Sequence, residues 1–436
     1  MIARLALLLV LAAAPVLSGA WPLDGYSETG IRRVEGERLI NEGVISGRQQ
    51  PAGGRLTTAQ VDLRLLDYRD MELPAPDPAF TRQIVKLLGS NAGRYGLAIL
   101  DISDPGKPRY AEHRGNYRQN VGSVGKLLVA LGLFQALADA WPDDLAKRTQ
   151  VLKDTRVTAD EFSHWDHHKI RVFDVAAQKF TRRKMKDGDQ GSLWEYLDWA
   201  LSASANSAAA MSMREALLLR QYGRDYPPPA AEIQRFFNET PKQELTTLFQ
   251  QTFFEPVIRN GLDLEQLRQG SFFTRTGKHK VPGGGNSYGT ARELAKYALR
   301  MEQGRLVDEY SSRQIKRLLY MTERRIRYAS SPALRDSAVY FKSGSLYSCR
   351  EEPGFKCGKY MGNKMNYMNS LAIIENNTAD RRLDYIVTLI SNVLRVNSAV
   401  DHQTLGTRIH RLMERAHPVP VPEPDAKATA ESVVHP

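Results

Sequence analysis

Segments typical of β-strands lie near both ends of the chain, and the long stretch between them has mainly helical patterns. Residues 93–103 alternate and are rich in β-forming side chains, a turn follows at Asp104-Pro105-Gly106, and PRYAEHRG reads as the returning strand. Three more strand candidates follow one another late in the chain, at 338–348, 368–376 and 384–394. The sequence therefore predicts an α+β fold: an antiparallel five-stranded sheet assembled from both chain ends, flanked by helices, with an inserted all-helical lobe.

Several helices carry boundary signals. A helix is expected from about Asp77 to Leu88, and Ser192-Leu193-Trp194-Glu195 is a capping box that predicts a helix start just before WEYLDWALSAS. Two further helices are expected at 290–304 and 402–416. The lobe inserted into the sheet is expected to span about 127–330.

The first residues are typical of a cleaved secretory signal. Residues 1–20 carry one positive charge, Arg4, then an apolar run, then small residues at Ser18 and Ala20. An uncleaved anchor is the alternative, but the apolar run is shorter than the roughly 20 residues that a membrane span needs. We expect a periplasmic or secreted protein of a bacterial envelope, with no stable membrane insertion after signal cleavage.

The remaining chain divides by composition. Residues 21–79 are irregular and rich in turn residues, which predicts an N-terminal extension packed on the main domain. Residues 80–416 hold all the strand candidates and form the expected main domain. The tail, 417–436, is rich in proline, and we expect it to be disordered.

The formal net charge of +11 permits attraction to anionic polymers. The basic residues are scattered and lack the interleaved aromatic residues and fold motifs of nucleic-acid binders, so no nucleic-acid partner is expected. An anionic cell wall or membrane surface is the stronger possibility, and a solvated basic face is the simpler one.

The chain has two cysteines, Cys349 and Cys357. An oxidising compartment would let them form a disulfide, while two buried free thiols are the alternative. A metal site made from two cysteines alone is not expected.

Three short motifs carry the candidate chemistry. Ser123 and Lys126 form S-x-x-K in NVGSVGKLLVALGLFQAL, Ser204-Ala205-Asn206 follows a predicted helix, and Lys342-Ser343-Gly344 lies on a predicted strand. A serine hydroxyl is a poor nucleophile unless a neighbouring base takes its proton. Because residues three apart share one face of a helix, Lys126 can reach the oxygen of Ser123.

A single S-x-x-K match is common at ordinary helix starts, but the three motifs in this order and structural context are not. The set resembles the active-site serine enzymes that include penicillin-binding proteins and class A β-lactamases, over roughly residues 80–416. The resemblance implies that Ser123 is the acylated nucleophile and that Lys126, made partly neutral by burial and by nearby Lys342, is its base. It also implies that Ser204 passes a proton to the leaving nitrogen and that Asn206 binds the substrate's amide side chain.

The same resemblance assigns roles to the third motif. Lys342 and Ser343 would attract the substrate carboxylate, and Gly344 would leave room for an acyl chain beside the strand. The tetrahedral oxyanion would accept hydrogen bonds from the backbone N–H groups of Ser123 and Ser345.

Deacylation separates these enzymes from one another. Class A β-lactamases use a glutamate, usually in E-x-x-x-N, and here Glu255 begins EPVIRN, with the asparagine one residue late. Glu255 is therefore a candidate deacylating base, or simply a residue at a helix end near a turn. The long charged segment between the first two motifs, and Ala205 where class A enzymes generally carry aspartate, weaken a strict class A assignment.

These observations predict an exported serine hydrolase that acts through an acyl-enzyme on β-lactams or D-alanyl-D-alanine peptides, the latter from peptidoglycan stems. The alternatives are a D,D-carboxypeptidase-type penicillin-binding protein, a non-catalytic cell-wall-binding or sensor module, and an esterase on the same scaffold. A Ser-His-Asp hydrolase is disfavoured, because Val121 stands where a nucleophile elbow needs glycine. No cofactor is expected, and the oligomeric state is open.

Two other groups of residues each have a functional and a simple structural interpretation. SHWDHHK brings His164, Asp166, His167 and His168 together, but it lacks the glutamate of the zinc-protease motif, so a polar surface segment is favoured and no metal is assigned. One of the arginines before the third motif, Arg324, Arg325 and Arg327, is a candidate for binding a carboxylate with two hydrogen bonds, and ion pairing between helices is the ordinary reading.

Overall fold

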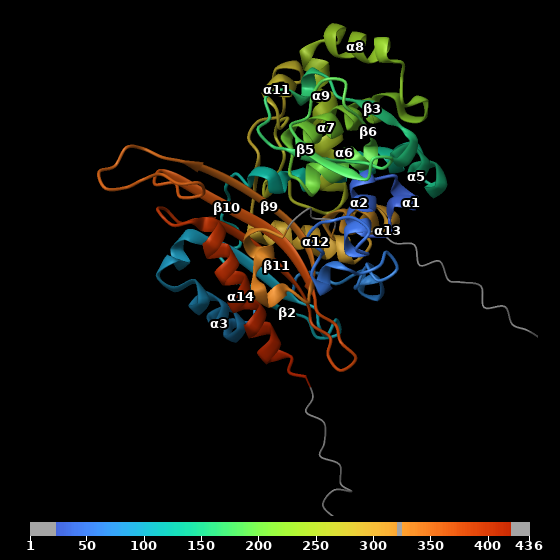
Figure 1. The fold of residues 1–436 in the computed structure, drawn as a ribbon. Coiled ribbons are helices and arrows are strands. Elements are labelled where there is room, and N and C mark those ends of the chain that lie inside the picture. Colours follow the sequence, from blue (N-terminus) through green and yellow to red (C-terminus); the bar gives the residue numbers. More distant parts are fainter. Residues whose placement is uncertain (1–22, 321–324, 420–436) are drawn as a thin grey trace, which may run out of the picture.

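The computed structural model describes residues 23–320 and 325–419. Its centre is an antiparallel five-stranded sheet in the order β2-β1-β11-β10-β9 (Figure 1). The strands are β1 (Tyr95–Asp101), β2 (Arg109–His113), β9 (Ala338–Ser348), β10 (Met365–Glu375) and β11 (Asp384–Asn392). The predicted α+β fold, with a sheet built from both ends of the domain, is confirmed.

Helices cover both faces of this sheet. α3 (Pro78–Leu88) and α14 (Ser398–Ala416) lie on one face, and α12 (Ala291–Glu302) lies on the other (Figure 1). Within β1, Leu97 and Ile99 belong to the core under α3 and α14, whereas Ala98 and Leu100 belong to the larger core on the opposite face. This alternation follows from the two-residue period of a strand.

The inserted lobe is mainly helical. The expected helix after the Ser192–Glu195 capping box is present as α6, and both halves of the box are formed. The helices of the lobe are α4 (Lys126–Ala140), α5 (Leu145–Asp154), α6 (Leu193–Leu201), α7 (Asn206–Tyr222), α8 (Ala230–Glu239), α9 (Lys242–Phe253), α10 (Glu255–Arg259), α11 (Arg275–Lys280) and α13 (Glu309–Tyr320).

The stretch Gly122–Ala140 is long and apolar enough to span a membrane, but 89% of its most apolar window is buried within the protein. It contains α4, whose side chains are buried on nearly every side by the rest of the lobe. This burial is typical of the central helix of a large core.

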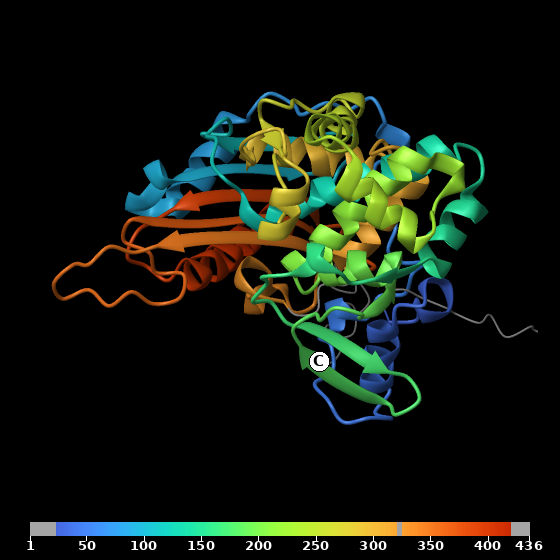
Figure 2. The same ribbon diagram turned by 90° about the horizontal axis from the view of Figure 1, so that it is seen from above.

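The lobe also contains three two-stranded sheets, which corrects the all-helical expectation in this detail. They pair β3 (Arg156–Thr158) with β6 (Gln190–Ser192), β4 (Ile170–Asp174) with β5 (Lys179–Arg183), and β7 (Leu267–Arg268) with β8 (Tyr288–Gly289). The β4–β5 hairpin forms because the short runs IRVFD and KFTRR, rich in β-branched and aromatic residues, flank a turn. Figure 2 shows this hairpin beside α2 (Arg32–Asn41).

The N-terminal segment is tied to the lobe by charged pairs. α1 (Tyr26–Thr29) precedes α2, whose Arg32 and Arg33 each form a 2.7 Å ion pair, with Glu195 and Asp198 of α6. The predicted signal, residues 1–20, and most of the predicted disordered tail lie outside the described residues.

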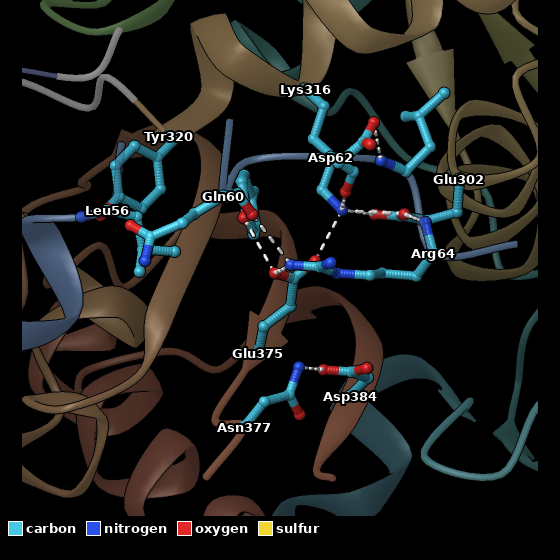
Figure 3. A network of polar contacts seen from close by, with 12 residues as sticks. Leu56, Gln60, Asp62, Arg64, Glu302, Lys316, Tyr320, Glu375, Asn377 and Asp384 are labelled. Carbon is cyan, nitrogen blue, oxygen red and sulfur yellow. Dashed lines mark hydrogen bonds and ion pairs between the residues drawn. The ribbon is translucent and has the colours of Figure 1, made fainter. Parts of the chain in front are cut away.

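A buried polar network joins this segment to the sheet (Figure 3). Lys316 on α13 donates to Glu302 on α12 and to Glu375 on β10, and Arg64 of the N-terminal segment also binds Glu375. Two cations and two carboxylates therefore neutralise one another inside the protein.

Candidate active site

Ser123 lies on a short 3-10 turn, Gly122–Gly125, which leads directly into α4. Lys126 is the first residue of α4, so a tight turn rather than a regular α-helix separates the two side chains. The expected contact is nonetheless made, because Lys126 Nζ lies 2.9 Å from Ser123 Oγ. Lys126 is fully buried, and its Nζ also lies 2.8 Å from the backbone carbonyl of Ser204 and 2.7 Å from Asn206 Oδ1. The first and second motifs thus meet at one nitrogen.

Burial controls the charge of this lysine. Loss of solvation lowers the pKa of Lys126 to about 7, although the negative charge of Asp166 acts in the opposite direction. The centroid of the Phe273 ring lies 4.6 Å from Lys126 Nζ, and the ring covers the amine with an apolar surface. A lysine with this pKa is neutral in about half of the molecules at pH 7, and a neutral amine can take the proton of Ser123.

Lys342 brings the third motif to the same place. From β9 its Nζ donates to Ser204 Oγ over 2.8 Å and to the carbonyl of Ser343 over 3.0 Å. Burial, followed by the positive charges of Lys126 and Arg327, holds the pKa of Lys342 well below its ordinary value. Ser204 therefore contacts both lysines, with its hydroxyl facing Lys342 and its carbonyl facing Lys126.

Gly344 is required by close backbone packing. A Cβ atom at this position would lie 2.1 Å from the carbonyl oxygen of Val121 and 2.6 Å from the amide nitrogen of Ser123. The turn that carries Ser123 fills the space that a side chain at this position would occupy. A Cβ on Gly122 would lie 3.3 Å from the amide nitrogen of Ser345, so the turn also runs close to that amide.

An arginine donates hydrogen bonds to two serines of β9 beside Lys342. Arg327 donates from Nη1 to Ser343 Oγ over 2.8 Å and from Nη2 to Ser345 Oγ over 2.9 Å. Arg325 instead donates to backbone carbonyls, including that of Leu334, and Arg324 lies outside the described residues. Of the two described arginines of this group, Arg327 is therefore the one that lies at the site.

Glu255 does not lie at the site, which corrects its prediction as a deacylating base. Its carboxylate pairs with Arg220, 2.7 Å away, and the same arginine also binds Asp139, near the last turn of α4. Asp139 is 13 residues beyond Lys126 on α4, or about 20 Å along the helix axis at 1.5 Å per residue. A local resemblance to E-x-x-x-N could not reveal that this segment packs at the opposite end of α4.

A different loop lies over the serine turn. A Cβ on Gly125 would lie 2.2 Å from Gln269 Oε1, and Phe273 from the same loop covers Lys126. Neither residue belongs to a motif, so the sequence alone did not indicate them. Among the described residues, no carboxylate accepts a hydrogen bond from Lys126.

The SHWDHHK segment contacts the first turn of α7 through one side chain. Asp166 accepts hydrogen bonds from Ser207 and His168, so both of its oxygens are engaged, while His164 pairs with Asp187 at 2.7 Å. The possible metal-ligand atoms of Asp166, His167 and His168 lie within 4.8 Å of one another, and those of Asp166 and His168 contact each other.

Farther from the serine, Cys349 and Cys357 are joined by a disulfide. It lies in the connection between β9 and β10, which extends beyond the sheet (Figure 2).

Comparison with known proteins identifies a family. Residues 79–355, more than half of the chain, match the model of the β-lactamase enzyme family. No curated protein sequence matches the chain.

Among solved structures, the chain is similar to PBP-A, with 14% identity over 79% of this chain and all of that one and a TM-score of 0.47. A β-lactamase from Chitinophaga pinensis shows 15% identity over 77% of this chain and 99% of that one, with a TM-score of 0.48. The reconstructed class A β-lactamase of the last common ancestor of Gram-negative bacteria shows 20% identity over 78% of this chain and 99% of that one, with a TM-score of 0.46. The family match, rather than these distant structural similarities, carries the assignment: the chain belongs to the β-lactamase enzyme family.

Proposed function

We propose that this protein is an exported active-site serine hydrolase that forms an acyl-enzyme at Ser123 with β-lactams or D-alanyl-D-alanine peptides. The observation that carries the proposal is the contact between Ser123 Oγ and a buried Lys126 Nζ at 2.9 Å, with the pKa of that lysine near 7. Residues 1–20 and the disulfide support export. Residues 80–416 would form the catalytic domain.

In the proposed acylation, neutral Lys126 takes the proton of Ser123 as Oγ attacks the carbonyl carbon of the substrate amide. The electron pair of the carbonyl moves onto its oxygen, which accepts hydrogen bonds from the amides of Ser123 and Ser345. When the tetrahedral intermediate collapses, the carbon–nitrogen bond breaks, and Ser204 gives its proton to the leaving nitrogen. Lys126 restores the proton of Ser204, directly or through Lys342, so no net proton is gained or lost.

The groups around β9 suit a substrate with a free carboxylate. Hydrogen-bond donors and positive charge lie beside the serine, supplied by Lys342, Ser343 and Arg327. A bound carboxylate would also raise the pKa of Lys342 and favour its charged form. Asn206, whose Oδ1 accepts from Lys126, would use its NH₂ group to bind the carbonyl of the substrate's side-chain amide.

The surroundings of Lys126 favour a penicillin-binding peptidase over an efficient β-lactamase. Fast hydrolysis of a penicilloyl-enzyme needs a base for the attacking water, and Glu255 shares Arg220 with Asp139, at the end of α4 opposite Lys126. The loop over the serine contributes Gln269 and Phe273, which are not bases at neutral pH. The intact contact between Ser123 and Lys126 argues against a module that only binds cell-wall fragments.

The test is a time course of labelling by a fluorescent penicillin on purified mature protein, chased with unlabelled drug, with Ser123→Ala as the control. Label that depends on Ser123 and persists for many minutes supports the penicillin-binding peptidase. Label that disappears quickly with release of hydrolysed drug identifies a β-lactamase instead. No label on the wild type, with turnover of small acyl esters, would identify an esterase and overturn the proposal.

A further inference from the structure

The second motif of this chain lacks an acidic residue at its centre. Ala205 occupies the N-cap of α7 and has no side chain that can accept a hydrogen bond from the first amides of the helix. The amide of Ser207, in the first turn, needs an acceptor from elsewhere. Asp166, 41 residues earlier, provides it: its Oδ2 lies 2.9 Å from the amide nitrogen and 3.1 Å from the hydroxyl of Ser207.

Asp166 is held rigidly for this contact. Its side chain is 4% exposed, and Oδ1 accepts from the backbone amide of His168 over 3.0 Å and lies 2.6 Å from His168 Nδ1. Burial alone would raise the pKa of Asp166, but hydrogen bonds and charge from His168, with the amide of Ser207, hold it below its ordinary value. The carboxylate is therefore ionised at neutral pH, and a negative charge at a helix N-terminus is favourable.

The same helix start carries catalytic groups. Asn206 is the first residue of α7, and its Oδ1 accepts from Lys126 over 2.7 Å. Ser204, two residues before α7, accepts from both lysines of the site. Any displacement of the start of α7 therefore displaces two of the three oxygens around Lys126 Nζ.

We propose that Asp166 is a positioning residue of the active site: it caps α7 in place of Ala205 and so holds Ser204 and Asn206 against Lys126, with His168 orienting its carboxylate. This inference rests on the proposed acylation at Ser123. It assigns the SHWDHHK segment a part in the reaction without contact with the substrate.

The charge of Asp166 gives the proposal a distinctive signature. The charged groups around Lys126 are Lys342 and, beyond it, Arg327 on the side of β9, and Asp166 with the imidazole of His168 on the side of α7. Of these, Asp166 is the group whose charge raises the pKa of Lys126, while burial lowers it. Removing that charge should lower the pKa of Lys126, so that the amine is neutral at lower pH. Substitution of a residue with a merely structural role would not change this pKa.

The experiment measures the second-order rate constant of acylation by a fluorescent penicillin from pH 5 to 9. Asp166→Asn keeps an oxygen for Ser207 but removes the charge. The pH at which the rate constant falls to half of its high-pH plateau is therefore expected about half a pH unit or more below that of the wild type, with a similar plateau rate. Asp166→Ala also removes the cap, and its plateau rate is expected to fall about tenfold or more. Asp187→Asn is the matched control, because it removes a charge from a 62% exposed carboxylate near the same segment.

A profile for Asp166→Asn that coincides with that of Asp187→Asn, together with an unreduced plateau for Asp166→Ala, would overturn the inference. If the wild type is not acylated at all, the proposed function fails, and the capping is then tested by hydrogen exchange. The amide of Ser207 is expected to exchange faster in Asp166→Ala than in the wild type, and unchanged exchange would overturn the capping role. If Asp166→Ala does not fold, His168→Ala tests the orienting contact instead, because it removes the 2.6 Å contact between Nδ1 and Oδ1 of Asp166, and a plateau rate equal to that of the wild type would overturn the part given to His168.

Discussion

Lowering the pH through 7 should switch off acylation by protonating one buried amine. At its ordinary pKa of 10.5, Lys126 would be neutral in about one molecule in 3,000 at pH 7. With a pKa of about 7, the neutral fraction is about 0.9 at pH 8 and about 0.01 at pH 5. If neutral Lys126 is the base, the rate constant of acylation should therefore be about 90-fold lower at pH 5 than at pH 8.

The direction of this change is that expected of a buried base, and Lys342 on the side of β9 also has a pKa well below its ordinary value because of its burial. Acid slows the reaction because the base must be unprotonated, and the other titratable groups on the α7 side do not produce a limb near pH 7. Hydrogen bonds hold the pKa of Asp166 below its ordinary value, against the effect of burial. Burial lowers the pKa of His168 below its ordinary value, so this side chain is already neutral near pH 7.

The assay is stopped-flow acylation by a fluorescent penicillin at constant ionic strength, with the thermal unfolding midpoint measured at each pH. A midpoint that stays well above the assay temperature excludes acid unfolding as the cause of the limb. A rate constant that changes less than about threefold between pH 5 and 8 would refute the assignment of neutral Lys126 as the base.

Three substitutions test other parts of the account. Gly344→Ala inserts a methyl group into the backbone of the serine turn, so it should abolish labelling and cost about 1–3 kcal/mol in the free energy of unfolding by urea, whereas Gly93→Ala, with open space around it, should do neither. Equal labelling of both variants would contradict the packing argument. Glu255→Gln should leave the rate of label loss in a chase unchanged within twofold, and a large slowing would restore this residue as the deacylating base. Lys316→Met leaves two buried carboxylates without their shared cation, so urea unfolding should show a loss of about 3–5 kcal/mol, and an unchanged free energy would contradict the network.

Local sequence patterns predicted the elements of this fold well. The segment AVYFKSGSLYS is strand β9 with the predicted bounds, and the Ser192 capping box marks the start of α6. Both signals lie within one element, where residue type and spacing act directly on the backbone. The motif lysines were identifiable for a related reason, since S-x-x-K places Lys126 beside Ser123 within a single turn.

Such patterns could not predict contacts between segments that are distant in the sequence. Glu255 begins a plausible motif, but the packing of α10 against α4 decides at which end of the lobe it lies. Asp166 and Phe273 reach Lys126 from segments with no recognisable catalytic motif, because the tertiary fold brings them there. The packing of Gly344 against the backbone of a turn more than 200 residues earlier is another contact of this kind.

The most direct test of the central claim is mass spectrometry of the intact mature protein after exposure to benzylpenicillin, followed by peptide mapping. We expect the addition of one penicilloyl group to the wild type, located on the peptide that contains Ser123, and no addition to Ser123→Ala. A wild-type protein that remains unmodified, or an adduct that maps to another residue, would contradict it.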